Sequence, residues 1–188
     1  MATLDQFAVE RLGFAAVGEN VMLSDRASFY NCANISLGNN VRIDDFCVLA
    51  AGAGGIVIGN YVHIAVASTL IGSGKITMAD FTGLSSRVSI YSSSDDYSGA
   101  TMTNPVVPSE YAGVVHADVY LGRHVIVGSG SVILPGVTLA EGVAVGALSM
   151  VNKNCEPFGI YVGNPARRIK ERKRDLLELE KLLLRESA

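Results

Sequence analysis

Aliphatic residues recur every six positions along most of this chain. In the second half the leading positions are Leu121, Val127, Ile133, Leu139, Val145 and Val151. Four positions after each of them stands a small or β-branched residue, such as Val125, Ser131 or Val137. A fixed period this short is typical of a β-solenoid, in which short strands stack coil upon coil around one continuous core.

The same rhythm runs through the first half in four sets of three, with longer steps between the sets. The sets begin with Val17, Leu23, Phe29; then Leu37, Ile43, Leu49; then Ile58, Ile64, Leu70; then Met78, Leu84, Ile90. Each set predicts one triangular coil, which gives six coils over residues 17–163 together with the second half. The extra residues between sets predict a bulge at one stacked corner. Its glycines are expected to supply positive φ, namely Gly52, Gly54, Gly55, Gly72 and Gly74.

The rhythm stops once, between Ile90 and Leu121. These leading positions lie 31 residues apart, where a step of six is expected. The chain therefore leaves the solenoid near Ser92 and returns near Val119, so residues 92–118 are predicted to form an extruded loop. A connection of this length inside a compact domain is usually functional or disordered.

Helical patterns occupy both ends of the chain. A short helix is expected from Leu4 to Leu12, within an N-terminal cap of residues 1–16. Pro165 begins a second pattern with a leucine stripe, which predicts a C-terminal helix over residues 164–188 that packs on the solenoid or on a neighbouring subunit. Caps of this kind hide the open ends of a solenoid.

Composition and charge narrow the class of protein. No apolar run approaches the roughly 18 residues of a membrane span, and no signal peptide is visible, so no membrane insertion is expected. The net charge of −3 gives no indication of a nucleic-acid partner. Three cysteines at unrelated spacings argue against disulfides and zinc, and they fit a cytoplasmic protein.

The hexads, the long loop and the closing run Gly-Asn-Pro-Ala-Arg-Arg-Ile at residues 163–169 resemble the hexapeptide-repeat acyltransferases. The sugar O-acetyltransferases of galactoside, maltose and O-antigen type are the most similar, and the resemblance covers roughly Val17 to Lys170. It implies an all-β solenoid, specifically a left-handed parallel β-helix, that assembles as a homotrimer with active sites between adjacent subunits. It also implies acetyl-CoA as co-substrate, and a sugar acceptor used in surface polysaccharide metabolism.

The resemblance places a catalytic histidine in the loop shortly after the last hexad before the break. This chain carries Asp95 at that place, and an unperturbed aspartate, with a pKa of about 4, is a weak base. We therefore expect His63, just before the hexad lead Ile64, to be the base. Asp95 or Asp96 would hold its ring from across a subunit interface. His116, where the loop returns, is the alternative base.

Other site residues are expected in the loop and along the later coils. The acceptor would contact Tyr97, Asn104, Tyr111 and His116. The resemblance implies that CoA lies along Ser129, Gly146, Ala147, Asn152, Lys153, Arg167 and Arg168. Small residues there let the pantetheine arm lie flat, and guanidinium groups suit phosphates. No metal is expected, because His63, His116 and His124 lack the spacing of the gamma-type carbonic anhydrases. His124 is expected to face outward at a turn.

The sequence leaves the acceptor open. The first interpretation is O-acetylation of a sugar hydroxyl. The main alternative is N-acetylation of a nucleotide-linked amino sugar, because an amine that enters as the free base needs less help with proton removal than an alcohol. A solenoid that binds sugar without catalysis is a third interpretation, because the loop histidine is missing.

Overall fold

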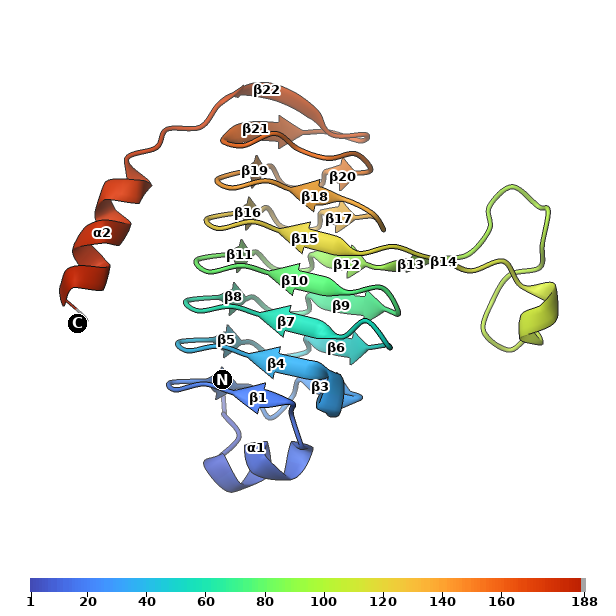
Figure 1. The fold of residues 1–188 in the computed structure, drawn as a ribbon, viewed down its shortest axis with the longest axis horizontal. Helices are drawn as coiled ribbons and strands as arrows, with labels where there is room; N and C mark the ends of the chain where they lie inside the picture. The colour runs from blue at the N-terminus through green and yellow to red at the C-terminus, as the bar shows by residue number, and fades with distance from the viewer. Residues whose placement is uncertain (187–188) are drawn as a thin grey trace.

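The chain forms a β-solenoid of stacked three-stranded coils (Figure 1). The structure is a computed structural model that describes residues 1–186. Three sheets run along the stack, and every pairing between successive coils is parallel. The predicted solenoid is confirmed. It has the six complete coils predicted, and β21 begins a seventh, incomplete coil on the second sheet.

Each coil contributes one short strand to each sheet. The first sheet contains β1 (Ala16–Val17), β4 (Ile35–Leu37), β7 (Ile56–Ile58), β10 (Ile76–Met78), β15 (Val119–Leu121) and β18 (Thr138–Leu139). The second contains β2 (Met22–Leu23), β5 (Arg42–Ile43), β8 (His63–Ile64), β11 (Gly83–Leu84), β16 (Ile126–Val127), β19 (Ala144–Val145), β21 (Gly159–Val162) and β22 (Arg167–Glu171). The third contains β3 (Ser28–Tyr30), β6 (Val48–Ala51), β9 (Thr69–Gly72), β12 (Ser89–Tyr91), β17 (Val132–Ile133) and β20 (Met150–Val151).

The hexad leads form the core, as the period predicts. Ile43 and Ile64 pair on the second sheet and are completely buried, and Val127 lies buried two coils further on. The residue before each lead points the other way, because successive side chains of a strand face opposite sides of the sheet. Arg42 and His63 therefore stand side by side on the outer face.

The glycine-rich corner lies between the third and first sheets. Positive φ occurs at Gly55 (+77°) and Gly72 (+143°), but not at Gly52, Gly54 or Gly74, for which that expectation was wrong. Those three are glycines because the coils touch there. A Cβ on Gly54 would lie 2.4 Å from the backbone nitrogen of the next coil at Lys75. The extra residues between hexad sets therefore stack at one corner, as predicted.

The long loop leaves the stack from this same corner. β12 ends at Tyr91 and β15 begins at Val119, and between them β13 (Ser93–Ser94) and β14 (Val115–His116) pair antiparallel as a stem. A 3₁₀ turn at Ser109–Tyr111 lies near the tip. Figure 1 shows the loop as an arm projecting from the side of the stack, so the protruding loop is confirmed.

Helix α1 (Gln6–Leu12) lies beneath the first coil. Asp5 caps its first turn by accepting a hydrogen bond from the Ala8 amide (2.8 Å), and Gly13 ends it in the left-handed conformation. The apolar side chains of Leu4 and Val9 pack against the core. The helix expected at this end is confirmed.

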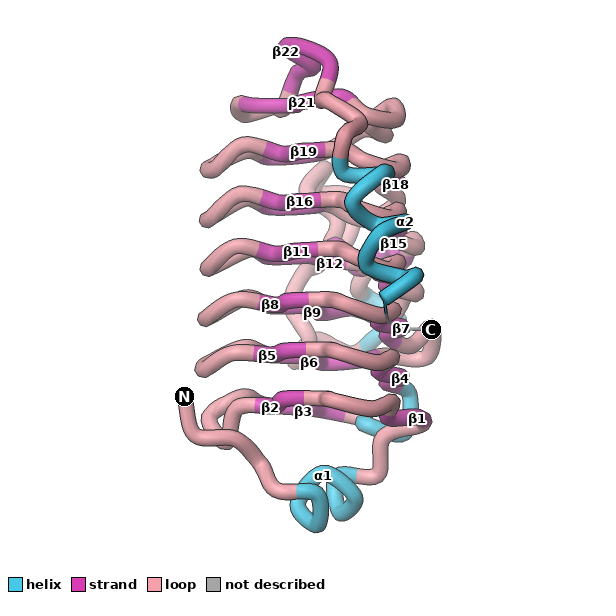
Figure 2. Tube along the Cα trace, turned by 90° about the vertical axis from the view of Figure 1, so that its left-hand side faces the viewer, coloured by secondary structure: helices cyan, strands magenta, loops and turns pink. Residues whose placement is uncertain are grey.

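The C-terminal segment differs from its prediction at the start. Arg167–Glu171 form the strand β22, antiparallel to β21, where a helix from Pro165 was expected. The last coil has an open edge of backbone donors and acceptors, and a strand satisfies these groups where a helix would leave them unpaired. Helix α2 (Leu176–Glu186) follows and runs along the side of the stack instead of covering its end (Figure 2). Residues 187–188 of the predicted helix lie outside the described residues.

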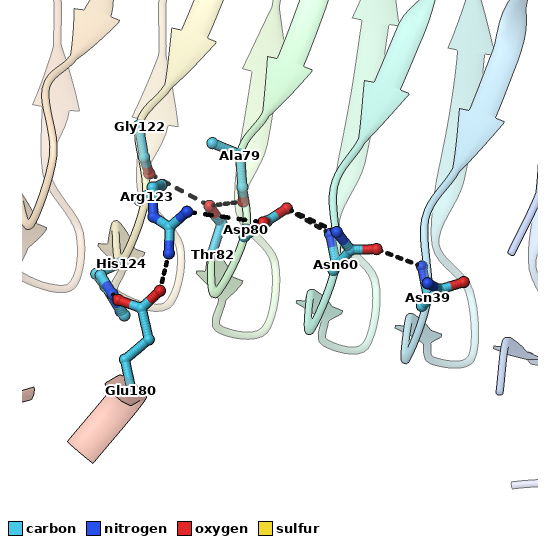
Figure 3. Close-up of polar contacts among 9 residues, drawn as sticks. All are labelled: Asn39, Asn60, Ala79, Asp80, Thr82, Gly122, Arg123, His124 and Glu180. Atoms are coloured by element: carbon cyan, nitrogen blue, oxygen red, sulfur yellow. Dashed lines mark hydrogen bonds and ion pairs between the residues drawn. The ribbon is translucent and has the colours of Figure 1, made fainter. Parts of the chain in front are cut away.

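A charged contact docks α2 on the corner between the first and second sheets (Figure 3). Glu180 accepts from the Arg123 guanidinium and from His124 Nε2, the latter at 2.7 Å. The His124 ring stacks on Phe81, with centroids 5.0 Å apart. His124 is only 9% exposed, so the expectation that it faces outward was wrong, because α2 covers it. Burial and the Arg123 charge lower the pKa of His124.

Glu180→Ala is expected to release α2 from the stack while the solenoid stays folded. The change removes the acceptor for two donors, one of them on a buried ring, at a cost of about 1–3 kcal/mol to docking. Hydrogen exchange should show loss of amide protection in α2 with the β-strands unchanged. Glu178→Ala is the matched control, because within residues 1–186 the Glu178 side chain pairs with the exposed Lys181 and not with the solenoid. Equal protection in the two variants would contradict this docking.

Candidate active site

A hollow of about 300 Å³ opens on the outer face of the second sheet. Its walls come from β8, β11 and β16 in three successive coils and include His63, Ser85, Ser86 and Ser129. Gly83, in the coil that follows, pairs with His63. Because Gly83 has no side chain, the wall beside the imidazole stays open. We call this the histidine hollow. It brings the expected base together with Ser129, one of the residues expected to hold CoA.

His63 is held by a carboxylate of its own chain. Its Nε2 lies 2.9 Å from Asp44 Oδ2, and the other oxygen of Asp44 accepts from Arg42 Nε at 2.7 Å. Burial works to raise the pKa of Asp44, but the hydrogen bonds from Arg42 and His63 outweigh it and the pKa is lowered. Within one chain Asp44 therefore holds this ring. The expectation that Asp95 or Asp96 reaches the ring from across a subunit interface stays a prediction.

A second hollow, of about 540 Å³, lies where the loop joins the stack. Asp95, Asp96 and Tyr97 line it from the loop, and Pro135 and Asn152 line it from later coils. We call this the loop hollow. It joins three residues expected at the catalytic or acceptor site to one expected at the CoA site. It does not contain His63, which stands on another face of the same chain.

The two loop aspartates have different environments. Asp96 accepts from the amide of Ser98 (2.8 Å) and from the amide and hydroxyl of Thr101 (3.0 and 3.2 Å). These bonds, those from Ser98 first, lower the pKa of Asp96 to about 2, so this carboxylate orders the loop and is a very weak base. In the described chain the Asp95 carboxylate makes no hydrogen bond, which leaves it available to a ligand in the loop hollow.

Of the other loop residues expected to bind the acceptor, two make hydrogen bonds within the loop and two are exposed to solvent. His116 Nδ1 lies 2.7 Å from Ser93 Oγ in the stem, and Asn104 accepts from the Val106 amide (3.1 Å) in a local turn. Tyr97 is 93% exposed and Tyr111 is also exposed. A single chain therefore does not gather the four expected acceptor residues into one site.

The residues expected to bind CoA fall into three groups. Ser129, Gly146 and Ala147 stack at the corner between the second and third sheets, where a Cβ on Gly146 would lie 2.7 Å from Val162 Cγ1. Asn152 and Lys153 follow β20 at the corner that bears the loop. Arg167 and Arg168 lie exposed on β22, and Arg168 pairs with Glu171. All three groups lie in the later coils, but each group lies on a different side of the solenoid.

Within residues 1–186 no group of three or more His, Cys, Asp or Glu side chains is arranged to hold a metal ion. The same residues include no helix long and apolar enough to cross a membrane.

Sequence comparison identifies the family. No family model matches the chain. A dTDP-4-amino-4,6-dideoxy-D-glucose acyltransferase from Escherichia coli is 59% identical over 180 residues, which cover 96% of this chain and 94% of the relative. The chain belongs to the hexapeptide-repeat acyltransferases. It is therefore an acyltransferase by family, as the hexads and the loop indicate.

Solved structures of other acyltransferases match over nearly the whole chain. AntD, an N-acyltransferase from Bacillus cereus in complex with dTDP and 3-hydroxybutyryl-CoA, has a TM-score of 0.95 and 46% identity, over 98% of this chain and 97% of AntD. Another AntD structure, a serine variant, holds dTDP-4-amino-4,6-dideoxyglucose and CoA, with a TM-score of 0.94 and 45% identity over 98% of each chain. A maltose O-acetyltransferase from Clostridium difficile 630 shares the fold, at 22% identity and a TM-score of 0.63, over 93% of this chain and 80% of that one.

The sequence interpretation missed Ser85, which lines the histidine hollow, and Asp44, which contacts His63. Ser85 directly follows the hexad lead Leu84, so the coil phase alone could have placed it beside the outer face. Asp44 follows the lead Ile43 in the same way, one coil before His63. Comparing outward positions between neighbouring coils is the signal that finds both.

Proposed function

We propose that this protein transfers an acyl group from acyl-CoA to the amino group of a dTDP-linked 4-amino-4,6-dideoxy sugar. The observation that carries the proposal is the 59% identity, over nearly the full length of both chains, to a relative named for that acceptor. The AntD complexes with dTDP, the amino sugar and CoA support it. They favour the N-acylation alternative over O-acetylation of a polysaccharide sugar, which was the first expectation from the sequence.

The proposed reaction is direct acyl transfer. The amine lone pair attacks the thioester carbon, the C–N bond forms, and the C–S bond breaks. His63 takes the proton that the nitrogen loses and returns it to the departing CoA sulfur, so the products are the amide and free CoA thiol. Ser85, Ser86 and Ser129 line the space beside the ring and offer hydroxyl groups to the substrates. Holding both substrates in one hollow supplies proximity.

The loop is proposed to bind the amino sugar. The unpaired carboxylate of Asp95 can accept a hydrogen bond from the amine and orient its lone pair. AntD structures include variants of one serine and of one aspartate, which are the residue types that stand out in the two hollows of this chain. The two hollows lie on different faces of one chain. A homotrimer, in which the loop of one copy reaches the histidine hollow of its neighbour, remains the predicted assembly.

For acyl-CoA we propose the row of small residues at the corner between the second and third sheets. Ser129, Gly146 and Ala147 leave a smooth track for the pantetheine arm beside the histidine hollow. Lys153 and Arg167 are exposed cations near the end of the stack. In this proposal they bind the phosphate groups of CoA.

An acceptor panel tests the proposed function. The protein is incubated with acetyl-CoA or 3-hydroxybutyryl-CoA and with dTDP-4-amino-4,6-dideoxyglucose, maltose or a galactoside, and released CoA thiol and product mass are measured. We expect turnover of the amino sugar at least about 100-fold above that of either hydroxyl acceptor, since a site built to pair with an amine loses that pairing with other acceptors. Equal or better turnover of a hydroxyl acceptor would overturn the proposal.

Asp95→Asn supplies the matched test of the loop. It should raise KM for the amino sugar without changing KM for acyl-CoA, because only the acceptor contacts this carboxylate in the proposal. Glu110→Gln, in the exposed 3₁₀ turn of the same loop, is the control and should leave both constants unchanged.

A further inference from the structure

The carboxylate of Asp44 is fully engaged on the outer face of the second sheet. One oxygen accepts from Arg42 Nε at 2.7 Å and the other lies 2.9 Å from His63 Nε2. The Asp44 side chain is 15% exposed and that of His63 is 49% exposed. The carboxylate is thus held against the wall while the imidazole remains accessible from the histidine hollow.

This arrangement decides which ring nitrogen carries the hydrogen. An ionised carboxylate can only accept hydrogen bonds, so His63 Nε2 must donate. In a neutral imidazole the other nitrogen, Nδ1, then bears the free lone pair. Within residues 1–186 the His63 ring makes no further hydrogen bond, so Nδ1 is unoccupied. A base needs such a lone pair on its accessible side.

We propose that Asp44 is a positioning residue: it fixes His63 with the hydrogen on Nε2, so that Nδ1 is the atom that receives the substrate proton. The inference rests on the proposed function, in which His63 is the base. Arg42 has a separate part, since its guanidinium holds the orientation of the Asp44 carboxylate.

Arg42 determines how the new asparagine side chain in the Asp44→Asn variant would be oriented. A guanidinium is always protonated and can only donate, so the amide oxygen of the new asparagine must face Arg42. Its NH₂ group then faces His63 and donates to Nε2. The ring must carry its hydrogen on Nδ1 instead, so Nδ1 loses the lone pair that acts as base. The backbone and the side-chain volume hardly change.

Removing Arg42 in addition should reverse the effect. In the double variant Arg42→Ala/Asp44→Asn no donor holds the amide oxygen, so the asparagine can rotate and accept from Nε2. The hydrogen returns to Nε2 and Nδ1 becomes a base again. Arg42→Ala alone keeps the carboxylate and should leave the tautomer unchanged. A residue with only a packing role would not be rescued by a second loss of contacts.

The experiment combines kinetics with ¹⁵N NMR of the histidine-labelled protein, which distinguishes protonated from unprotonated ring nitrogens. We expect Asp44→Asn to lower kcat about 10²–10⁴-fold at unchanged KM for acyl-CoA, with the His63 tautomer reversed. Arg42→Ala loosens the carboxylate without removing it, so it should lower kcat at least tenfold less than Asp44→Asn does, and the double variant should recover at least tenfold over Asp44→Asn.

The NMR result separates this inference from the proposed function. If the wild type fails to acylate the amino sugar, the proposed function is wrong, while the tautomer measurement still decides whether Asp44 sets the ring. A wild-type ring protonated on Nδ1, an unchanged tautomer in Asp44→Asn, or full kcat in that variant would each overturn the positioning role. Circular dichroism of every variant shows whether a loss of activity comes from misfolding.

Discussion

His63→Ala is expected to lower kcat for acylation of the amino sugar by about 10²–10⁴-fold, the usual contribution of a general base. KM for acyl-CoA should change little, since the CoA track is proposed on neighbouring small residues. Fold stability should hardly move, because His63 projects outward from β8 and is half exposed. Steady-state kinetics with purified variants, together with thermal unfolding, measures all three quantities.

His116→Ala is the matched comparison for this prediction. His116 was the alternative base from the sequence, but in the structure it bonds Ser93 in the stem of the loop. Its removal should loosen the loop and raise KM for the acceptor, with a smaller loss in kcat than His63→Ala. If His116→Ala instead abolishes turnover while His63→Ala retains it, the base is His116 and the histidine hollow is not the reaction centre.

Gly54→Ala is expected to destabilise the solenoid by about 1–3 kcal/mol, the usual cost of forcing extra volume into a packed site. The new Cβ would lie 2.4 Å from the Lys75 backbone nitrogen, and backbone cannot turn aside as a side-chain tip can. Gly54 does not have positive φ, so the cost is purely one of space. Urea unfolding followed by circular dichroism gives the free energy of unfolding.

Gly83→Ala controls for loss of a glycine as such. A Cβ there meets only the flexible tip of Ile126, at 3.0 Å, and Gly83 likewise lacks positive φ. Its stability should stay within about 0.5 kcal/mol of wild type. Equal destabilisation by the two alanines would contradict the view that contact between coils at the glycine corner sets the cost.

Stacking of the coils brings together functional side chains that are far apart in the sequence. Residues on neighbouring coils lie side by side although 16 or more positions separate them in sequence, as Asp44 and His63 do. A coil can therefore place one functional side chain on the outer face while its hexad lead remains in the core. The loop adds a second surface from the glycine corner without disturbing the strand pairing above and below it.

The sequence by itself determined the solenoid, its core and the place of the loop. The hexad leads point inward and must be apolar, so the period fixes residues such as Ile64 and Leu70 in the core, and a break in the period must leave the stack. The outer face carries no such constraint, since an outward position accepts almost any residue.

Only the tertiary structure decided what the outward residues contact. Within one chain it paired His63 with Asp44, and it buried His124 beneath α2. It also made residues 167–171 a strand, because the open edge of the last coil needed a partner. These contacts join residues that are far apart in sequence. Which outward side chains lie next to each other depends on how many residues each coil contains, because that number sets the register between coils.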